Sequence, residues 1–355
     1  MRQAQQDLKQ LIEAEAKRLL AADGDIELDS LGGHASYRLY HRVRRGDRSL
    51  MLMELRGDPL ASEEASGGER PRELPFLTVQ RYLSAGGLPV PEVYAYLEAQ
   101  GLLLLEDLGD QTFEDIVAPL DDSARRAHYE RAIDLLLRFQ RHSLTARDAL
   151  CHSRRFTEAL LRWELDHFVE WMLEVQRGGE LDERERRIVE QHFDTIAREL
   201  AALPPLLAHR DYQSRNLMLQ VTDEGSRLCL IDFQDALLAP PTYDMVALLR
   251  DSYVHLGVPL VDTLIGYYLE RGGAELMGEL GVDPDDYRRL FWLQTVQRKL
   301  KDAGRFVFIE RVKNNDSFLV HIPRTLRTIV EAFEHIPHLL ELRDVLGAHV
   351  EELAR

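Results

Sequence analysis

The sequence predicts an α+β fold of two lobes, a small antiparallel β-sheet lobe followed by a mostly helical lobe. Two observations predict it. Short strand-like segments alternate with glycine-containing turns up to residue 106, and long helical patterns dominate after residue 107. We therefore expect an N-terminal domain over residues 1–106 and a C-terminal domain over residues 107–355. A chain of 355 residues is long enough to bury a separate core in each.

The N-terminal part combines strand and helix signals. Residues 3–22 have an amphipathic helical pattern, and residues 73–85 form a second helical pattern that ends at a Gly-Gly pair followed by prolines. Turn residues such as Arg45-Gly46-Asp47 separate the strand signals. The strands are expected over residues 25–28, 35–43, 49–54, 93–97 and 102–106.

Helical patterns in the second part are interrupted by one hairpin. Two apolar runs, residues 217–219 and 228–231, flank turn chemistry over residues 222–226, so the runs should pair as β-strands. The helices are expected over residues 122–142, 156–176 and 182–203, and they resume from residue 242.

The most informative motif surrounds this hairpin. His209-Arg210-Asp211 is followed by Asn216 before the first strand, and Asp232 follows the second strand. Kinases use such a set, in which one aspartate orients the attacking hydroxyl while an asparagine and a second aspartate hold magnesium. A hairpin brings its open ends together, so we expect Asn216 beside Asp232, with oxygen ligands that suit Mg²⁺. Asx residues also cap turns, but the whole spaced set favours a kinase that binds ATP between two lobes.

Composition narrows the partners and the compartment. A net charge of −17 argues against nucleic acid or an anionic membrane as the main partner. No apolar run approaches the length of a membrane span, and the N-terminus lacks the apolar core of a signal peptide. Cys151 and Cys229 are the only cysteines and are expected to be reduced thiols. We expect a cytoplasmic protein, a monomer or a homodimer, that acts on a small molecule.

On these motifs the chain resembles the aminoglycoside phosphotransferase/choline kinase superfamily, which has a protein-kinase-like fold. Within it the chain is most similar to the bacterial anomeric N-acetylmuramate/N-acetylglucosamine kinases of cell-wall recycling, and the likeness runs over nearly the whole chain. The segments that carry the resemblance are residues 209–218, Ile231-Asp-Phe-Gln-Asp-Ala236, Pro241-x-Tyr-Asp244, Leu249-Arg-Asp251, Ala35-Ser-Tyr-Arg38 and Gln297-Arg-x-Leu-Lys301.

The resemblance implies roles for particular residues. Asp211 would be the catalytic aspartate that aims the sugar hydroxyl at the γ-phosphorus of ATP. Asn216 and Asp232 would be the magnesium ligands. The backbone between Glu106 and Leu108 would meet the adenine edge. The implied reaction is ATP-dependent phosphorylation of the anomeric hydroxyl of N-acetylmuramic acid or N-acetylglucosamine.

The chain departs from the usual kinase pattern in its nucleotide lobe. The third strand carries no lysine to hold the phosphates, and no lysine occurs between Lys17 and Lys299. A cation should still face the phosphates, and Arg38 is the first candidate because its planar fork can contact two phosphate oxygens. Arg42 is the weaker candidate. It lies an even number of residues after Arg38 and therefore on the same face of the strand. The glycine-containing turn over residues 31–36 could cover phosphates with its amides, including that of Ser36, or could be an ordinary hairpin turn.

Residues that contact the acceptor are harder to predict from sequence. Asp235 could face the sugar or the solvent, and Arg250 could reach the acceptor or belong to a solvated face. Gln297, Lys299 and the intervening Arg298 could contact an acidic sugar substituent. Asp244 is expected to cap the following helix and to steady the catalytic loop, and His209 is expected to be structural.

Other functions remain open at this level. An aminoglycoside, choline or homoserine kinase would share the catalytic set, and a cationic acceptor would need acidic or aromatic surroundings. The missing lysine also admits a nucleotide-binding pseudokinase. The presence of Asp211, Asn216 and Asp232 together favours an enzyme.

Overall fold

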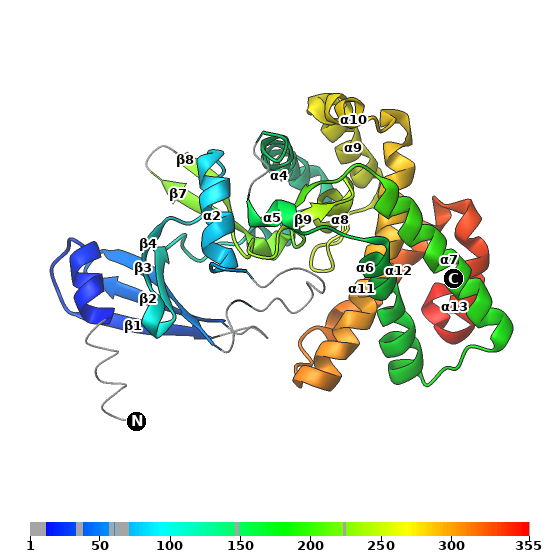
Figure 1. The fold of residues 1–355 in the computed structure, drawn as a ribbon, viewed down its shortest axis with the longest axis horizontal. Coiled ribbons are helices and arrows are strands. Elements are labelled where there is room, and N and C mark those ends of the chain that lie inside the picture. Colours follow the sequence, from blue (N-terminus) through cyan, green and yellow to red (C-terminus); the bar gives the residue numbers. More distant parts are fainter. Residues whose placement is uncertain are drawn as a thin grey trace. The chain divides into compact units, whose positions relative to one another are not determined.

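The chain divides into two compact units (Figure 1). The computed structural model describes residues 12–32, 38–56, 60, 71–145, 149–222 and 225–354. Unit 1 comprises Met1–Asp110 and Met218–Gln234, and unit 2 comprises Gln111–Leu217 and Asp235–Arg355. The boundary expected at residue 106 stays a prediction. We expected the hairpin in the helical part, but its contacts place Met218–Gln234 in unit 1.

Unit 1 is built on a five-stranded sheet in the order β1-β2-β3-β5-β4, and all its strand pairs are antiparallel, as predicted. The turn between β2 and β3 depends on Gly46, whose φ is 59°. An added Cβ at Gly46 would lie 2.8 Å from the carbonyl oxygen of Asp23, so only glycine fits this turn without a shift. The strands are β1 Ile26–Gly32, β2 Arg38–Arg45, β3 Arg48–Leu55, β4 Val93–Leu97 and β5 Leu102–Glu106.

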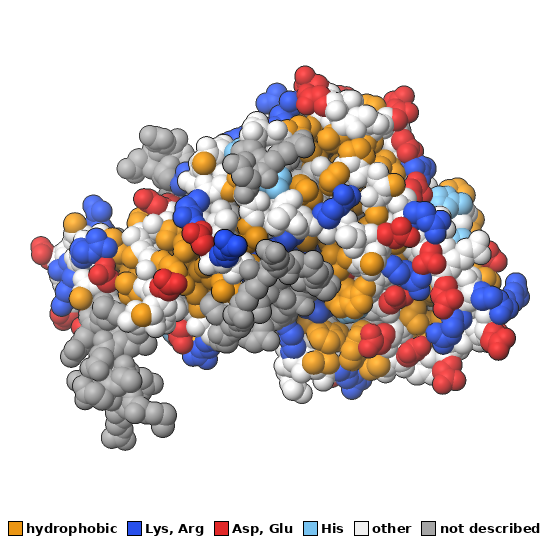
Figure 2. Space-filling model, viewed as in Figure 1, with side chains coloured by type: hydrophobic (Ala, Val, Ile, Leu, Met, Phe, Trp, Pro, Cys, Tyr) orange, Lys and Arg blue, Asp and Glu red, His pale blue; other side chains and the backbone are white. Residues whose placement is uncertain are grey.

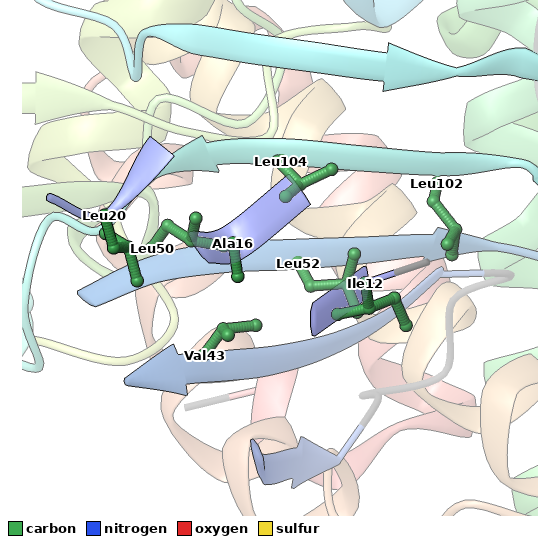
Figure 3. Close-up of a cluster of buried hydrophobic side chains, with 8 residues drawn as sticks. All are labelled: Ile12, Ala16, Leu20, Val43, Leu50, Leu52, Leu102 and Leu104. Carbon is green, nitrogen blue, oxygen red and sulfur yellow. The ribbon is translucent and has the colours of Figure 1, made fainter. Parts of the chain in front are cut away.

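The sheet buries one face against the N-terminal helix, of which residues 12–19 are described. Figure 3 shows the apolar side chains of this helix directed at those of β2, β3 and β5. Alternation places Leu50 and Leu52 of β3 on one face, and Leu102 and Leu104 of β5 on one face, because successive side chains of a strand point to opposite sides. The buried cluster consists of Ile12, Ala16, Leu20, Val43, Leu50, Leu52, Leu102 and Leu104.

The hairpin is the second component of unit 1. Its strands, β7 Leu217–Thr222 and β8 Gly225–Leu230, pair in a two-stranded sheet, as predicted. The backbone N–H of Leu230 donates to the carbonyl oxygen of Pro89 at 2.8 Å. Phe233, just after β8, stacks on Phe76 of helix α2 (Pro75–Ala85) with ring centroids 5.0 Å apart. These contacts explain why the hairpin belongs to unit 1.

Unit 2 is mostly helical. Helix α4 begins at the predicted residue and α7 one residue later than predicted, because Asp121 and Asp182 accept hydrogen bonds from backbone N–H groups of the first turn. The helix expected over residues 156–176 starts at Glu158 and continues beyond α6 as a π-helical stretch, Phe168–Gln176. The helices are α3 Phe113–Val117, α4 Asp122–His142, α5 Leu150–Ser153, α6 Glu158–His167, α7 Glu183–Ala202, α8 Tyr243–Leu249, α9 Val258–Tyr268, α10 Ala274–Leu280, α11 Tyr287–Lys313, α12 Ile322–Glu334 and α13 Leu340–His349.

One short sheet of unit 2 was not predicted. Strand β6 (Leu206–Ala208) pairs antiparallel with β9 (Leu237–Ala239). Because β6 ends immediately before His209, this sheet fixes the position where the predicted catalytic loop begins.

The surface carries charges of both signs (Figure 2), and the two cysteines are buried thiols. On the face shown in Figure 2, acidic and basic side chains are interspersed over the helical elements. Cys151 and Cys229 are both buried and unbridged, as expected. Among the described residues, no helix is both long and apolar enough to span a membrane.

Candidate active site

The loop that carries Asp211 is held at its start by a buried carboxylate of unit 2. Asp244 is 2% exposed and accepts hydrogen bonds from the backbone N–H groups of His209 at 2.6 Å and Arg210 at 3.2 Å. Arg210 has a φ of 75°, a conformation that non-glycine residues adopt at a cost and that is concentrated at functional sites. The expectation that Asp244 steadies this loop is therefore confirmed.

The expected helix-capping role of Asp244 is wrong. Helix α8 begins at Tyr243, so Asp244 lies inside its first turn, and Thr242 is the residue before the helix. Burial raises the pKa of Asp244 to about 7, even though the two N–H groups and the nearby Arg298 favour its charged form.

The far end of the same loop is held by a second buried carboxylate. Asp251 accepts hydrogen bonds from both the backbone N–H, at 2.9 Å, and the hydroxyl of Ser214. Asp251 and Ser214 are 2% and 1% exposed. This contact was not predicted, since nothing in the spacing of the two residues pairs them. The loop is thus fixed on both sides of Asp211.

Asp211 itself is accessible. Its side chain is 46% exposed, and its Oδ1 accepts a hydrogen bond from Arg298 Nη2 at 3.2 Å. Asn216 donates from its amide nitrogen to the Asp211 carbonyl oxygen at 2.8 Å. That hydrogen bond uses the nitrogen of the Asn216 amide. The amide oxygen is not used in it, and oxygen is the atom type that Mg²⁺ binds.

In unit 1, Asp232 lies beside the arginine that was predicted to replace the missing lysine. Asp232 is 45% exposed, has a φ of 62° and accepts hydrogen bonds from Arg38 Nη1 at 3.4 Å and from Gln234 at 2.9 Å. Tyr40 lies two residues after Arg38 on β2. Burial and the negative charge of Asp232 raise the pKa of Tyr40 to about 12. A carboxylate, a guanidinium and a phenol therefore meet within unit 1.

Arg42, the weaker candidate for the phosphate cation, has a structural role. It is 4% exposed, and its fork binds both carboxylate oxygens of Asp107, at 2.7 and 3.0 Å, and one of Asp110 at 2.6 Å. Nη2 also donates to the Gly109 carbonyl at 3.1 Å. Burial alone would raise the pKa of Asp107, but the hydrogen bonds from Arg42 hold it below its ordinary value. Since all three nitrogens of Arg42 are engaged, it ties residues 107–110 to the sheet and is not placed to bind phosphate.

The other residues expected to bind nucleotide are described only in part. Glu106 accepts hydrogen bonds from Gln220 at 2.6 Å and from the backbone N–H of Glu92 at 3.2 Å. Leu108 is 8% exposed and packs in a small apolar cluster with Met218 and Cys229. Ser36 lies outside the described residues.

The four predicted acceptor residues lie in unit 2 and are engaged with other side chains there. Lys299 donates to Ser252 and Asp302, and Arg250 binds Glu331. Gln297 donates to Glu164, and Asp235 lies near Arg154, where it opposes the lowering of the Arg154 pKa by burial. Their contact with a substrate stays a prediction.

A small antiparallel sheet with Asp232 at the end of its associated hairpin, and a helical unit that presents Asp211 and Asn216, define a phosphotransferase with a kinase-like fold. Residues 31–280 match the phosphotransferase enzyme family APH. The chain belongs to this family, as its sequence motifs predicted.

Two curated relatives are similar over most of the chain. N-acetylmuramate/N-acetylglucosamine kinase of Pseudomonas aeruginosa is 32% identical over 324 residues, which cover 91% of this chain and 88% of that protein. The kinase of the same name from Pseudomonas putida is 30% identical over 320 residues, which cover 90% and 87%.

Solved structures support the fold. Choline kinase from Streptococcus pneumoniae matches with a TM-score of 0.59 at 15% identity, covering 92% of this chain and 99% of that one. An aminoglycoside phosphotransferase with ADP bound matches with a TM-score of 0.53 at 15% identity, covering 90% and 97%. The predicted α+β, protein-kinase-like fold class is confirmed.

Proposed function

We propose that the protein transfers the γ-phosphate of ATP to the anomeric hydroxyl of an N-acetylated amino sugar, N-acetylmuramic acid or N-acetylglucosamine. The names of the relatives that are 30% and 32% identical over nine-tenths of the chain support this choice of acceptor. The observation that carries the chemistry is the exposed Asp211 carboxylate on a loop fixed by two buried aspartates. A place in cell-wall recycling and in the cytoplasm follows from the same proposal.

Asp211 would accept a hydrogen bond from the sugar hydroxyl and aim its oxygen in line with the γ-phosphorus. The acceptor oxygen then forms a bond to phosphorus, the bond to the β-phosphate oxygen breaks, and the hydroxyl proton passes to Asp211. Positioning supplies much of such catalysis, because phosphoryl transfer needs little covalent assistance. The strained, doubly braced loop is consistent with that requirement.

Asn216 and Asp232 would hold Mg²⁺ through an amide oxygen and a carboxylate. Both side chains are partly exposed, both offer hard oxygen ligands, and Asp232 stands in the left-handed conformation seen at functional sites. When bound, the ion would neutralise charge on the β- and γ-phosphates.

Arg38 would supply the cation that ordinary kinases take from a lysine. Its contact with Asp232 supports this assignment, because the phosphates must approach the metal ligand. The backbone between Glu106 and Leu108, and Ser36, would complete the nucleotide site.

A panel of acceptors incubated with γ-labelled ATP and magnesium tests the proposal. Label on the anomeric oxygen of an N-acetyl amino sugar, identified by phosphorus coupling to the anomeric proton, supports it. Turnover only with choline, homoserine or an aminoglycoside would replace it with another kinase activity. ATP binding without turnover of any acceptor would indicate a pseudokinase.

Asp211→Asn links the activity to the site. It should abolish most turnover and leave ATP binding nearly intact, because the lost interaction matters mainly in the transition state. Asp316→Asn, which changes an exposed aspartate after helix α11, is the matched control and should leave turnover unchanged.

A further inference from the structure

Helix α11 places a completely buried arginine behind Asp211. Arg298 is 0% exposed, and its only hydrogen bond among the described residues runs from Nη2 to Asp211 Oδ1 at 3.2 Å. Its guanidinium lies over the ring of Tyr243, 4.7 Å from the centroid. Asp211, in contrast, is half exposed. A buried cation therefore contacts one oxygen of an accessible carboxylate.

The rest of the Arg298 fork is unsatisfied. Nε and Nη1 are buried, and neither has a hydrogen-bond acceptor among the described residues. A buried charged donor without an acceptor lowers stability, and native proteins keep few of them. Arg42 shows the opposite pattern, because all three of its nitrogens donate to oxygens. Arg42 is arranged as a structural arginine should be, whereas Arg298 is held at a cost and, within the described part of the chain, makes its one hydrogen bond to Asp211.

The surroundings of Arg298 keep it charged. Burial alone would lower its pKa, but Tyr243, Asp302, Asp211 and Glu164 raise it above the ordinary value. Asp302 also pairs with Lys299 at 2.7 Å, so the anions near Arg298 are shared among several cations of α11. Arg298 is thus a permanent positive charge behind Asp211.

We propose that Arg298 is a positioning residue for the phosphoryl-transfer reaction: it fixes one oxygen of the Asp211 carboxylate so that the other faces the acceptor hydroxyl. The proposal rests on the catalytic role of Asp211 proposed above. The loop braces at Asp244 and Asp251 hold the main chain, and Arg298 sets the side-chain orientation that they leave open. A misplacement of about 1 Å at a reacting group can cost roughly 10²-fold in rate.

A double-mutant cycle of Arg298→Met with Asp211→Asn tests this role. Arg298→Met alone should lower kcat about 10²-fold and change the KM for ATP by no more than about twofold. In the Asp211→Asn background it should lower kcat by no more than about twofold, since the carboxylate that it orients is gone. Arg298→Lys, which keeps the charge but loses the planar fork, should recover part of the loss.

Thermal unfolding separates positioning from support of the fold. The partner of Arg298, Asp211, is half exposed and can be hydrated once the arginine is gone, so Tm of Arg298→Met should fall less than that of Arg42→Met, whose partner Asp107 is buried. Arg289→Met is the matched control: the same substitution on the same helix, at an arginine that pairs with Asp286 and Glu199, should leave kcat unchanged.

Two results would overturn the proposal. The first is a kcat of Arg298→Met equal to that of the unsubstituted protein. The second is a full 10²-fold loss that persists in the Asp211→Asn background. If Arg298→Met does not fold, the cycle is run with Arg298→Lys, whose smaller loss of kcat should likewise disappear in the Asp211→Asn background; a loss that persists there would overturn the proposal. Activity of Asp211→Asn near that of the unsubstituted protein would instead refute the proposed function, so the two failures are distinguishable.

Discussion

Substitution of Asp244 by asparagine should uncouple the start of the catalytic loop from helix α8. The two carboxylate oxygens of Asp244 accept the N–H groups of His209 and Arg210 separately. Asparagine offers one oxygen and would turn an N–H donor toward the other backbone N–H. One buried donor then loses its acceptor, which costs about 1–3 kcal/mol of the free energy of unfolding.

The effect should depend on pH because burial raises the pKa of Asp244 from 3.8 to about 7. Between these values the folded protein keeps a proton that the unfolded chain releases. The contribution of Asp244 to stability therefore falls as the pH rises from about 4 to 7. A shift of about three pKa units corresponds to up to about 4 kcal/mol over this window.

Urea unfolding followed by circular dichroism at pH 4.5, 6 and 7.5 measures both effects. The unsubstituted protein should lose stability relative to Asp244→Asn as the pH rises. Asp316→Asn, at an exposed position, should show no such relative change. If the difference between the protein and Asp244→Asn were constant across the three pH values, or grew with pH, the reasoning about the buried carboxylate would be wrong.

Three further substitutions test other parts of the structure. Arg38→Met should raise the KM for ATP about 10- to 100-fold, as expected for the loss of one charge-assisted contact, whereas Arg44→Met on the same strand should not; equal KM values in a coupled ADP assay would contradict the phosphate role. Arg42→Met should lower the free energy of unfolding by about 3–5 kcal/mol, because it leaves buried carboxylate oxygens without their cation; a denaturation midpoint unchanged in urea would refute this. Gly304→Ala should lower the melting temperature, since its Cβ would lie 2.2 Å from a main-chain oxygen, whereas Gly278→Ala, with open space around it, should not; calorimetry of both variants checks the contrast.

The sheet of unit 1 was largely predictable because its signals are local. Residues 50–53 form a short apolar run, and Gly46 marks the turn before it, so the strand position follows from nearest neighbours in sequence. Strand β9 shows the limit of that method. It has three residues, and its partner β6 lies about thirty residues earlier, so no local pattern distinguishes it from a loop.

The candidate site was predictable in its residue types but not in their partners. Asp211 and Asn216 could be recognised because they lie close together in sequence, in a spacing that kinases use. Their proposed roles stay predictions. The engagement of Arg42 with Asp107 joins residues 65 positions apart, and that of Arg250 with Glu331 joins residues 81 positions apart. Sequence spacing carries no information on such remote pairs. For that reason Arg250, at the end of an apolar helical run, could be read from sequence as solvent-exposed, although it is 2% exposed.

The discontinuity of unit 1 limits how this protein can be dissected or recombined. A fragment that stops at Asp110 would lack the ribbon of Met218–Gln234, and with it the hydrogen bond to Pro89 and the ring that stacks on Phe76. Exchange of unit 1 between relatives therefore requires two grafts, one at the amino end of the chain and one in its middle. A single crossover near residue 110 would combine the sheet of one parent protein with the hairpin of the other, which is fitted to a different sheet.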